Sequence, residues 1–187
     1  CILLLAACSK EPYSESFPEL HAYSDEQNYV LERMQWLGFD PSVLRTQELK
    51  DGLNVIFGYG GNILVSIGED GVVLVDAQFP EVYDGIIQEI NKLGGGPVDY
   101  LINTHFHFDH AEGNRAFGAM GADIIAHENS MEYFLQGADI DMVGIVWPQQ
   151  PYEKSARPKI TYSDKLTLNL NGHTIDLMHF GPAHTTT

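Results

Sequence analysis

The residues best suited to chemistry lie in the segment 103–114, which reads NTHFHFDHAEGN. Three histidines and an aspartate fall within six residues of it: His105, His107, Asp109 and His110. The whole chain contains only 8 histidines. Imidazole and carboxylate are preferred ligands of Zn²⁺, and an open coordination position on the ion leaves room for water. The segment therefore predicts a metal site.

The spacing divides these four side chains into two pairs. In an extended segment, alternate side chains point the same way, so His105 and His107 suit one ion. Asp109 and His110 follow where the chain turns, and they suit a second ion. An alternative is that Asp109 caps a helix, with Glu112 completing a capping box. A cap needs one carboxylate and no histidines, so the pattern favours metal ligands.

Strands and helices must position this segment. Apolar, β-branched runs separated by Gly-rich turns predict three strands: Leu53–Phe57, Ile63–Ile67 and Val72–Val75. An apolar stripe predicts a helix from Pro80 to Gly94, and the run VDYLIN predicts the strand that leads into the histidines. The alternation predicts an α/β domain.

The flanking parts of the chain give further predictions. Helices are expected at 25–37 and 128–136, and a strand at 123–127. The segment 137–159 contains three prolines and is expected to be a loop. The run KLTLNLNGHTIDLMHF predicts a hairpin that turns at Asn171-Gly172.

The motif THFHFDHAEGN resembles the signature of the metallo-β-lactamase superfamily. The resemblance spans roughly residues 53–187. It implies that His105 and His107 bind one metal ion, and that Asp109 and His110 bind another. Some redox-active relatives carry glutamate in place of the second histidine, so His107 favours the hydrolytic branch of the family.

Two shorter motifs extend the resemblance. FGPAHT at 180–185 is similar to the family's next motif, which implies that His184 completes the first metal site. VVLVDAQ is similar to the family's strand end, where the aspartate, here Asp76, supports the ligand loop. A carboxylate that contacts a ligand histidine orients its ring and raises its basicity.

The resemblance implies an αββα sandwich, of which this chain holds mainly the N-terminal half. It also implies a metal-dependent hydrolase with Zn²⁺, two ions in the complete protein, and Fe or Mn as alternatives. Metal-bound hydroxide would attack a carbonyl centre (β-lactam, lactone or thioester) or a phosphoryl centre of a small-molecule substrate. Asp109 would be the catalytic residue, both a ligand and the acceptor that orients the water. Two alternatives stay open: an iron-dependent redox or dioxygenase relative, and a non-catalytic metal-binding envelope lipoprotein.

The chain also departs from the family pattern. The sequence ends three residues after His184, and the family's bridging carboxylate and final histidine ligand come later still. We therefore expect the domain at 46–187 to be incomplete at its C-terminus. The intact gene is expected to continue for on the order of another 100 residues, which is within single-domain limits, and to supply a further Asp or Cys and a His.

The first residues, CILLLAAC, resemble the end of a bacterial lipoprotein signal. Residues 1–8 would be the signal remnant, with Leu5-Ala6-Ala7-Cys8 as its lipobox and the lipid on Cys8. Residues 9–45 would form a polar tether and a helix. The protein is then expected to be exported, either periplasmic or anchored to the membrane. An alternative is a short buried strand.

Composition narrows the class of partner. The 187 residues are 44% hydrophobic, enough for one domain with a sizeable core. Lys and Arg number 10 against 26 Asp and Glu, so the net charge of −16 makes nucleic acid an unexpected partner. The sequence leaves the oligomeric state open.

The remaining aromatic and histidine residues carry weaker signals. Four histidines are expected at the surface or hydrogen-bonded rather than bound to metal: His21, His127, His173 and His179. Trp147 and Tyr152 lie in the Pro-rich segment, where they could either roof a pocket or pack locally.

Overall fold

The computed structural model describes residue 13, residues 22–142 and residues 145–187. The predictions for the lipobox with Cys8, for His21 and for most of the tether lie outside these residues. In the described part, no helix is both long and apolar enough to cross a membrane.

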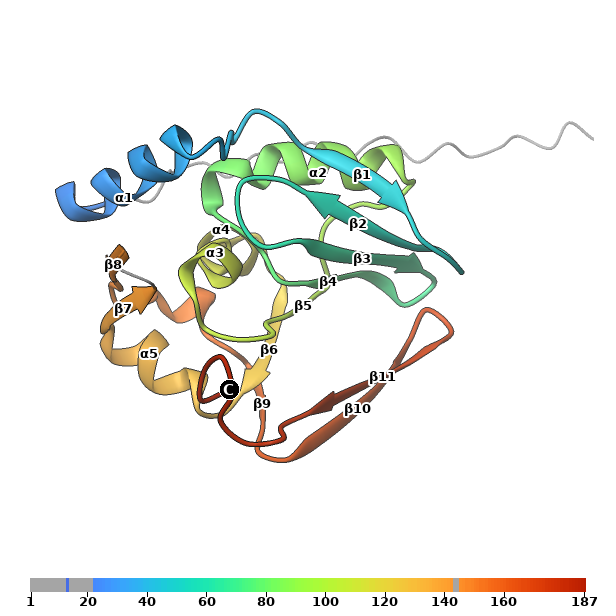
Figure 1. The fold of residues 1–187 in the computed structure, drawn as a ribbon. Coiled ribbons are helices and arrows are strands. Elements are labelled where there is room, and N and C mark those ends of the chain that lie inside the picture. Colours follow the sequence, from blue (N-terminus) through green and yellow to red (C-terminus); the bar gives the residue numbers. More distant parts are fainter. Residues whose placement is uncertain (1–12, 14–21, 143–144) are drawn as a thin grey trace, which may run out of the picture.

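The centre of the fold is a seven-stranded mixed sheet with strand order β1-β2-β3-β4-β5-β6-β9 (Figure 1). Strands β1 to β4 pair antiparallel, and β4, β5, β6 and β9 pair parallel. The strands are β1 (Arg45–Glu48), β2 (Leu53–Phe57), β3 (Ile63–Gly68), β4 (Gly71–Val75), β5 (Tyr100–Ile102), β6 (Asp123–His127) and β9 (Ile160–Tyr162). Because the parallel strands run the same way, the segments that follow β4, β5 and β6 meet at one edge of the sheet.

Helices cover one face of this sheet. The 3-10 turn η1 (Pro80–Val82) leads into α2 (Tyr83–Lys92), whose buried face contains Ile86, Ile87 and Ile90. Two shorter helices, α3 (Phe108–Ala111) and α4 (Asn114–Ala119), follow β5 and bury Phe108 and Phe117. These side chains join strand residues such as Leu74 in the larger hydrophobic core.

The opposite face is covered by a hairpin of β10 (Lys165–Leu170) and β11 (His173–Met178) (Figure 1). Its inward leucines and isoleucine pack on three buried residues of the sheet, Val73, Ile102 and Ile125. The hairpin turns at Asn171 and Gly172, which have φ values of 53° and 76°. The predicted turn is confirmed, because Asn-Gly tolerates the two left-handed residues that a tight hairpin requires.

The turn of this hairpin is also bonded to the sheet. The Asn171 amide donates to the hydroxyl of Ser66 and to the carbonyl oxygen of Gly71. The backbone N–H of Asn171 donates to the Asp70 carboxylate at 2.7 Å. These contacts fix the far end of the hairpin against the turn between β3 and β4.

The remaining elements lie around the helical face. Helix α1 (Asp25–Trp36) begins with a capping box made by Ser24 and Gln27. Gln27 also donates to the carbonyl oxygen of Pro148, at the end of the hairpin formed by β7 (Asp139–Met142) and β8 (Ile145–Pro148). Helix α5 (Ser130–Gln136) and the 3-10 turn η2 (Lys154–Ala156) complete the described elements.

Most of the predicted elements are confirmed, and one prediction is wrong. The predicted loop at 137–159 contains β7, β8 and η2. Ile140 and Trp147, which are partners across the β7–β8 hairpin, are buried in the core despite the nearby prolines. Trp147 is fully buried and stacks on Phe108 with ring centroids 4.5 Å apart. Tyr152 is also buried, so both aromatics pack locally rather than roof a pocket.

Candidate metal centre

The histidine segment lies at the edge of the sheet where the parallel strands end. It follows β5; His105 and His107 precede α3, and Asp109 and His110 lie within it. The N-cap residue of α3 is His107, whose side chain makes no capping hydrogen bond. The alternative in which Asp109 caps the helix is therefore wrong, since Asp109 lies inside the first turn.

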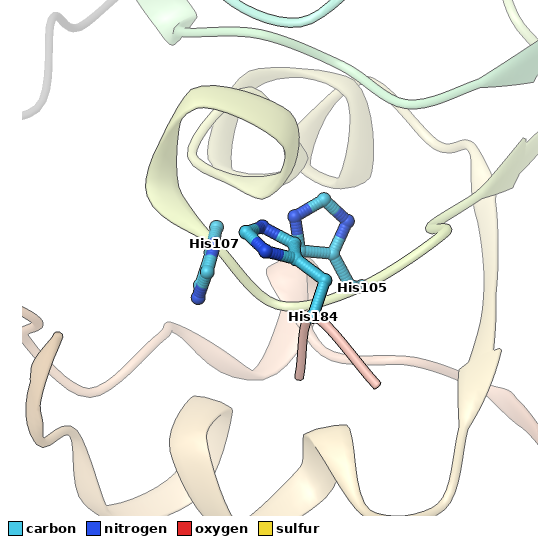
Figure 2. A group of neighbouring side chains, drawn as sticks. All are labelled: His105, His107 and His184. Carbon is cyan, nitrogen blue, oxygen red and sulfur yellow. The ribbon is translucent and has the colours of Figure 1, made fainter. Parts of the chain in front are cut away.

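Three histidines converge at this edge. One ligand atom from each of His105, His107 and His184 lies within 4.8 Å of the others. Figure 2 shows the three rings as close neighbours, with His184 approaching from the segment after β11. The structure thus brings together the two motifs that the sequence separates. Zinc–nitrogen bonds of about 2.0–2.1 Å require a small further inward movement of the rings.

Several polar atoms at this centre lack partners. His105 Nε2, His107 Nδ1 and Asp109 Oδ1 are buried and accept or donate no hydrogen bond. Buried polar atoms nearly always have a partner, because removal from water without one is costly. The unpaired imidazole nitrogens of His105 and His107, in a cluster with His184, fit a metal ion.

The electrostatics keep the first pair of histidines neutral. Burial, together with repulsion from neighbouring histidines, lowers the pKa of His105 to about 3. The same two causes lower the pKa of His107 to about 4. A metal ligand must be deprotonated, so protons do not compete with a metal for these two nitrogens at neutral pH.

Asp76 connects the ligand segment to the end of β4. The residue has a φ of 66°, a left-handed conformation that is uncommon for a non-glycine residue. Its buried carboxylate accepts hydrogen bonds from the backbone N–H and the hydroxyl of Thr104. It also lies 2.7 Å from Nδ1 of His110. Asp76 thus contacts both the backbone of Thr104 and the ring of His110 in the segment that the sequence predicts to bind metal.

These contacts determine which histidine nitrogens carry protons. A carboxylate only accepts hydrogen bonds, so His110 must donate from Nδ1 to Asp76. The Thr104 hydroxyl likewise donates to Asp76, which leaves its oxygen to accept from Nδ1 of His105, 2.8 Å away. Both imidazoles are therefore left with a lone pair on Nε2. Thr104 was not among the predicted site residues, because its role depends on this contact.

The second pair of predicted ligands is also adjacent in space. His110 Nε2 lies 3.5 Å from Asp109 Oδ2. Burial raises the pKa of the Asp109 carboxyl, and the charge of Asp76 adds to this effect. Burial alone would lower the pKa of His110, but the hydrogen bond to Asp76 and the charges of Asp76 and Asp109 outweigh it and raise this pKa.

A buried polar network supports α3 from behind. The Glu112 carboxylate, with no exposed surface, accepts hydrogen bonds from Arg115, Gln149 and the hydroxyl of Tyr152. Arg115 also donates to Glu153 at 2.6 Å. The network ties the turn after the ligand segment to the chain that follows β8.

The prediction for His127 fits its surroundings. Nδ1 of His127 accepts from the backbone N–H of Asn129, and Nε2 lies 2.5 Å from the carbonyl oxygen of Ser163. Both ring nitrogens therefore have hydrogen-bond partners. His127 also packs against His179, with ring centroids 3.9 Å apart.

Residues 57–187, more than half of the chain, match the sequence pattern of the Metallo-beta-lactamase superfamily. The chain belongs to this superfamily. A 42-residue stretch is 48% identical to the uncharacterized protein YobT of Bacillus subtilis, covering 22% of this chain and 18% of that protein.

Solved structures agree on the fold. A HARLDQ-motif metallo-β-lactamase of Cronobacter sakazakii is similar with a TM-score of 0.59, at 21% identity over 76% of this chain and 56% of that one. The class B3 di-zinc metallo-β-lactamase LRA-12 from an Alaskan soil metagenome gives a TM-score of 0.64, at 21% identity over 76% and 54%. A B3 enzyme described as having an active-site glutamic acid also gives 0.64, at 18% identity over 92% and 61%. The chain thus spans little more than half the length of these proteins.

Proposed function

We propose that this chain carries the metal centre of a zinc-dependent hydrolase. The observation that supports the proposal is the convergence of His105, His107 and His184, with ring nitrogens of the first two buried and unpartnered. Three histidines with an open fourth position are the ligand set of a catalytic rather than a structural zinc site.

A zinc ion held there would lower the pKa of a bound water to about 7 and so supply hydroxide at neutral pH. In this proposal Asp109 is the catalytic residue. Its buried Oδ1 has no partner and can accept a hydrogen bond from the water, which orients it. Asp109 and His110, adjacent at 3.5 Å, would hold a second ion. Thr104 and Asp76 would keep the protons of the His105 and His110 rings on Nδ1, which leaves Nε2 of each ring free to bind a metal ion.

The proposed substrate is a small molecule with a carbonyl or phosphoryl centre. The similar structures are of enzymes named as β-lactamases, which makes β-lactams the first class to test, followed by lactones, thioesters and phosphodiesters. The choice among these classes depends on the residues around the metal centre, because the fold does not fix the substrate.

The first experiment measures zinc binding to the metal-free 187-residue chain. The His105→Ala and His107→Ala variants each remove one of three ligands and should lower the affinity at least tenfold, since losses outside the ligand set already cost roughly 10–100-fold. His173→Ala is the matched control, because His173 lies on β11 outside the histidine cluster. Stoichiometric zinc in the His105→Ala/His107→Ala double variant would refute the ligand assignment.

Elemental analysis of the purified protein separates zinc from the iron expected of a redox relative. A screen of chromogenic β-lactams, lactones and phosphodiesters, carried out on the complete protein, then tests hydrolysis. A protein that binds zinc stoichiometrically but hydrolyses none of these classes, and whose bound zinc has no exchangeable water, would instead be a metal-binding protein without catalysis.

A further inference from the structure

A glycine-rich loop between β2 and β3 lies against the second pair of predicted ligands. It comprises residues 58–61, with the sequence GYGG, and is called the GYGG loop below. The backbone N–H of Gly61 donates to the carbonyl oxygen of Asp109 at 2.8 Å. The loop therefore contacts α3 at the turn that carries Asp109 and His110.

Gln78 holds the GYGG loop in place. Its side chain is fully buried, and its Oε1 accepts from the backbone N–H of Tyr59 at 3.1 Å. Its Nε2 donates to the carbonyl oxygen of Gly61 at 2.8 Å. Gln78 follows Asp76 by two residues and also has a left-handed φ, of 51°. The end of β4 thus fixes both the loop and the Nδ1 side of His110.

Gly61 leaves no room for a side chain. A Cβ atom there would lie 2.3 Å from Cε1 of His110, 2.5 Å from Nδ1 and 2.7 Å from Nε2. The φ of Gly61 is not in the left-handed range, so conformational freedom is not the reason for glycine at this position. The space that a side chain would need is occupied by the imidazole ring.

We propose that Gly61 is a positioning residue for His110. The ring is in contact with the GYGG loop and bonded to Asp76 through Nδ1, which leaves Nε2 beside Asp109. A side chain at Gly61 would displace the ring and break its bond to Asp76. This positioning role concerns the His110 ring itself; only the further step, in which Nε2 binds a metal ion, rests on the proposed function.

The first test uses the metal-free 187-residue chain and nitrogen–proton NMR of the imidazole rings. Wild type should show an Nδ1-bound proton on His110, protected by the hydrogen bond to Asp76. Gly61→Ala should lose this signal. Gly96→Ala should retain it, because a Cβ at Gly96 would meet no atom within 4 Å. An unchanged His110 signal in Gly61→Ala would overturn the proposal.

The second test is a double-mutant cycle with His110→Ala, measured by chemical unfolding. With the ring present, Gly61→Ala should lower the folding equilibrium constant about tenfold, a typical result of overpacking. In the His110→Ala background the same change should cost less than about twofold, because the clashing ring is gone. An equal loss in both backgrounds would mean that the glycine serves the loop rather than His110. If Gly61→Ala does not fold, a folded double variant supports the proposal and an unfolded one overturns it.

Zinc titration of wild type separates the two proposals. If the double-mutant cycle shows coupling between Gly61 and His110 but the wild-type chain binds no zinc, the proposed function is refuted and the positioning role is kept. If the cycle shows no coupling and the wild-type chain binds zinc, the positioning role alone is refuted.

Discussion

The change of Asp76 to Asn tests how the metal centre controls its protons. Asparagine has nearly the same shape and tolerates the left-handed backbone, so the φ of 66° can be kept. The amide Oδ1 can still accept from the backbone N–H of Thr104, which is 2.8 Å from the carboxylate. The amide nitrogen, however, replaces the oxygen that faces the Thr104 hydroxyl and Nδ1 of His110.

This replacement reverses the direction of the hydrogen bond between residue 76 and His110. The amide nitrogen donates to Nδ1 of His110, which moves the ring proton to Nε2. The Thr104 hydroxyl can still donate to Oδ1, 3.0 Å away, and accept from Nδ1 of His105, so the His105 ring keeps its proton on Nδ1. In His110 the lone pair needed for a metal then carries a proton. We expect zinc affinity to fall by roughly 10–100-fold, and the metal-free protein to lose about 1–2 kcal/mol through the lost charged hydrogen bond.

The assay combines zinc titration calorimetry with imidazole NMR of the metal-free protein. Asp99→Asn is the matched control, because the Asp99 carboxylate also accepts a backbone N–H, from Val72 at 2.8 Å, away from the histidines. If Asp76→Asn binds zinc as tightly as wild type and keeps the Nδ1 proton on His110, the reasoning about the protonation of this ring is wrong.

Three further predictions concern acid stability, a buried charge and the N-terminus. The pKa values of about 3 for His105 and about 4 for His107 lie below the ordinary 6.5, so the unfolded chain binds more protons than the folded one between these values. The free energy of unfolding of the metal-free protein should therefore fall as the pH drops from 6.5 toward 4, measured by urea titration. Glu112→Ala removes the buried carboxylate that pairs with the Arg115 guanidinium and should cost about 3–5 kcal/mol, whereas Glu153→Ala, whose side chain is 56% exposed, should cost at most about 1 kcal/mol. Metabolic labelling with a fatty-acid analogue should fail for Cys8→Ala if that residue carries a lipid.

Each of these predictions has an outcome that contradicts it. His107→Ala should reduce the fall in the free energy of unfolding between pH 6.5 and pH 4. An unchanged dependence on pH would show that other groups cause this fall. Equal losses of stability in the Glu112→Ala and Glu153→Ala variants would show that the buried network contributes no more than an exposed ion pair. Labelling should persist in Cys1→Ala, and a labelled Cys8→Ala protein would exclude the lipobox assignment.

Local sequence patterns were enough to predict much of the fold. Alternating apolar residues predicted β2, β3 and β4, and the Asn171-Gly172 pair predicted the hairpin turn, because each signal lies within a few residues. The segment 137–159 was mispredicted because its prolines indicate loops, while the burial of Trp147 against Phe108 depends on residues distant in the chain.

The same distinction between local sequence signals and contacts of distant residues applies to the candidate site. His105, His107, Asp109 and His110 are close in sequence, so their types and spacing were enough to propose them as candidate ligands. His184 was predicted only through the family resemblance, since no local pattern connects it to the others. Thr104, Gln78 and Gly61 were missed, because their roles exist only in the contacts made around the ligand rings. A threonine directly before the first ligand histidine was the one local signal available.

The position of His184 has a consequence for the motion of the β10–β11 layer. That hairpin packs on a small apolar cluster of the sheet around Val73, Ile102 and Ile125 and is held at its turn by Asn171. At its other end the chain continues to His184, beside His105 and His107. An ion bound there would also hold the open end, so that the hairpin would be fixed to the rest of the fold at both of its ends. Amide hydrogen exchange along β10 and β11 should then slow when zinc is added, with the largest change near Met178 and the smallest near Asn171.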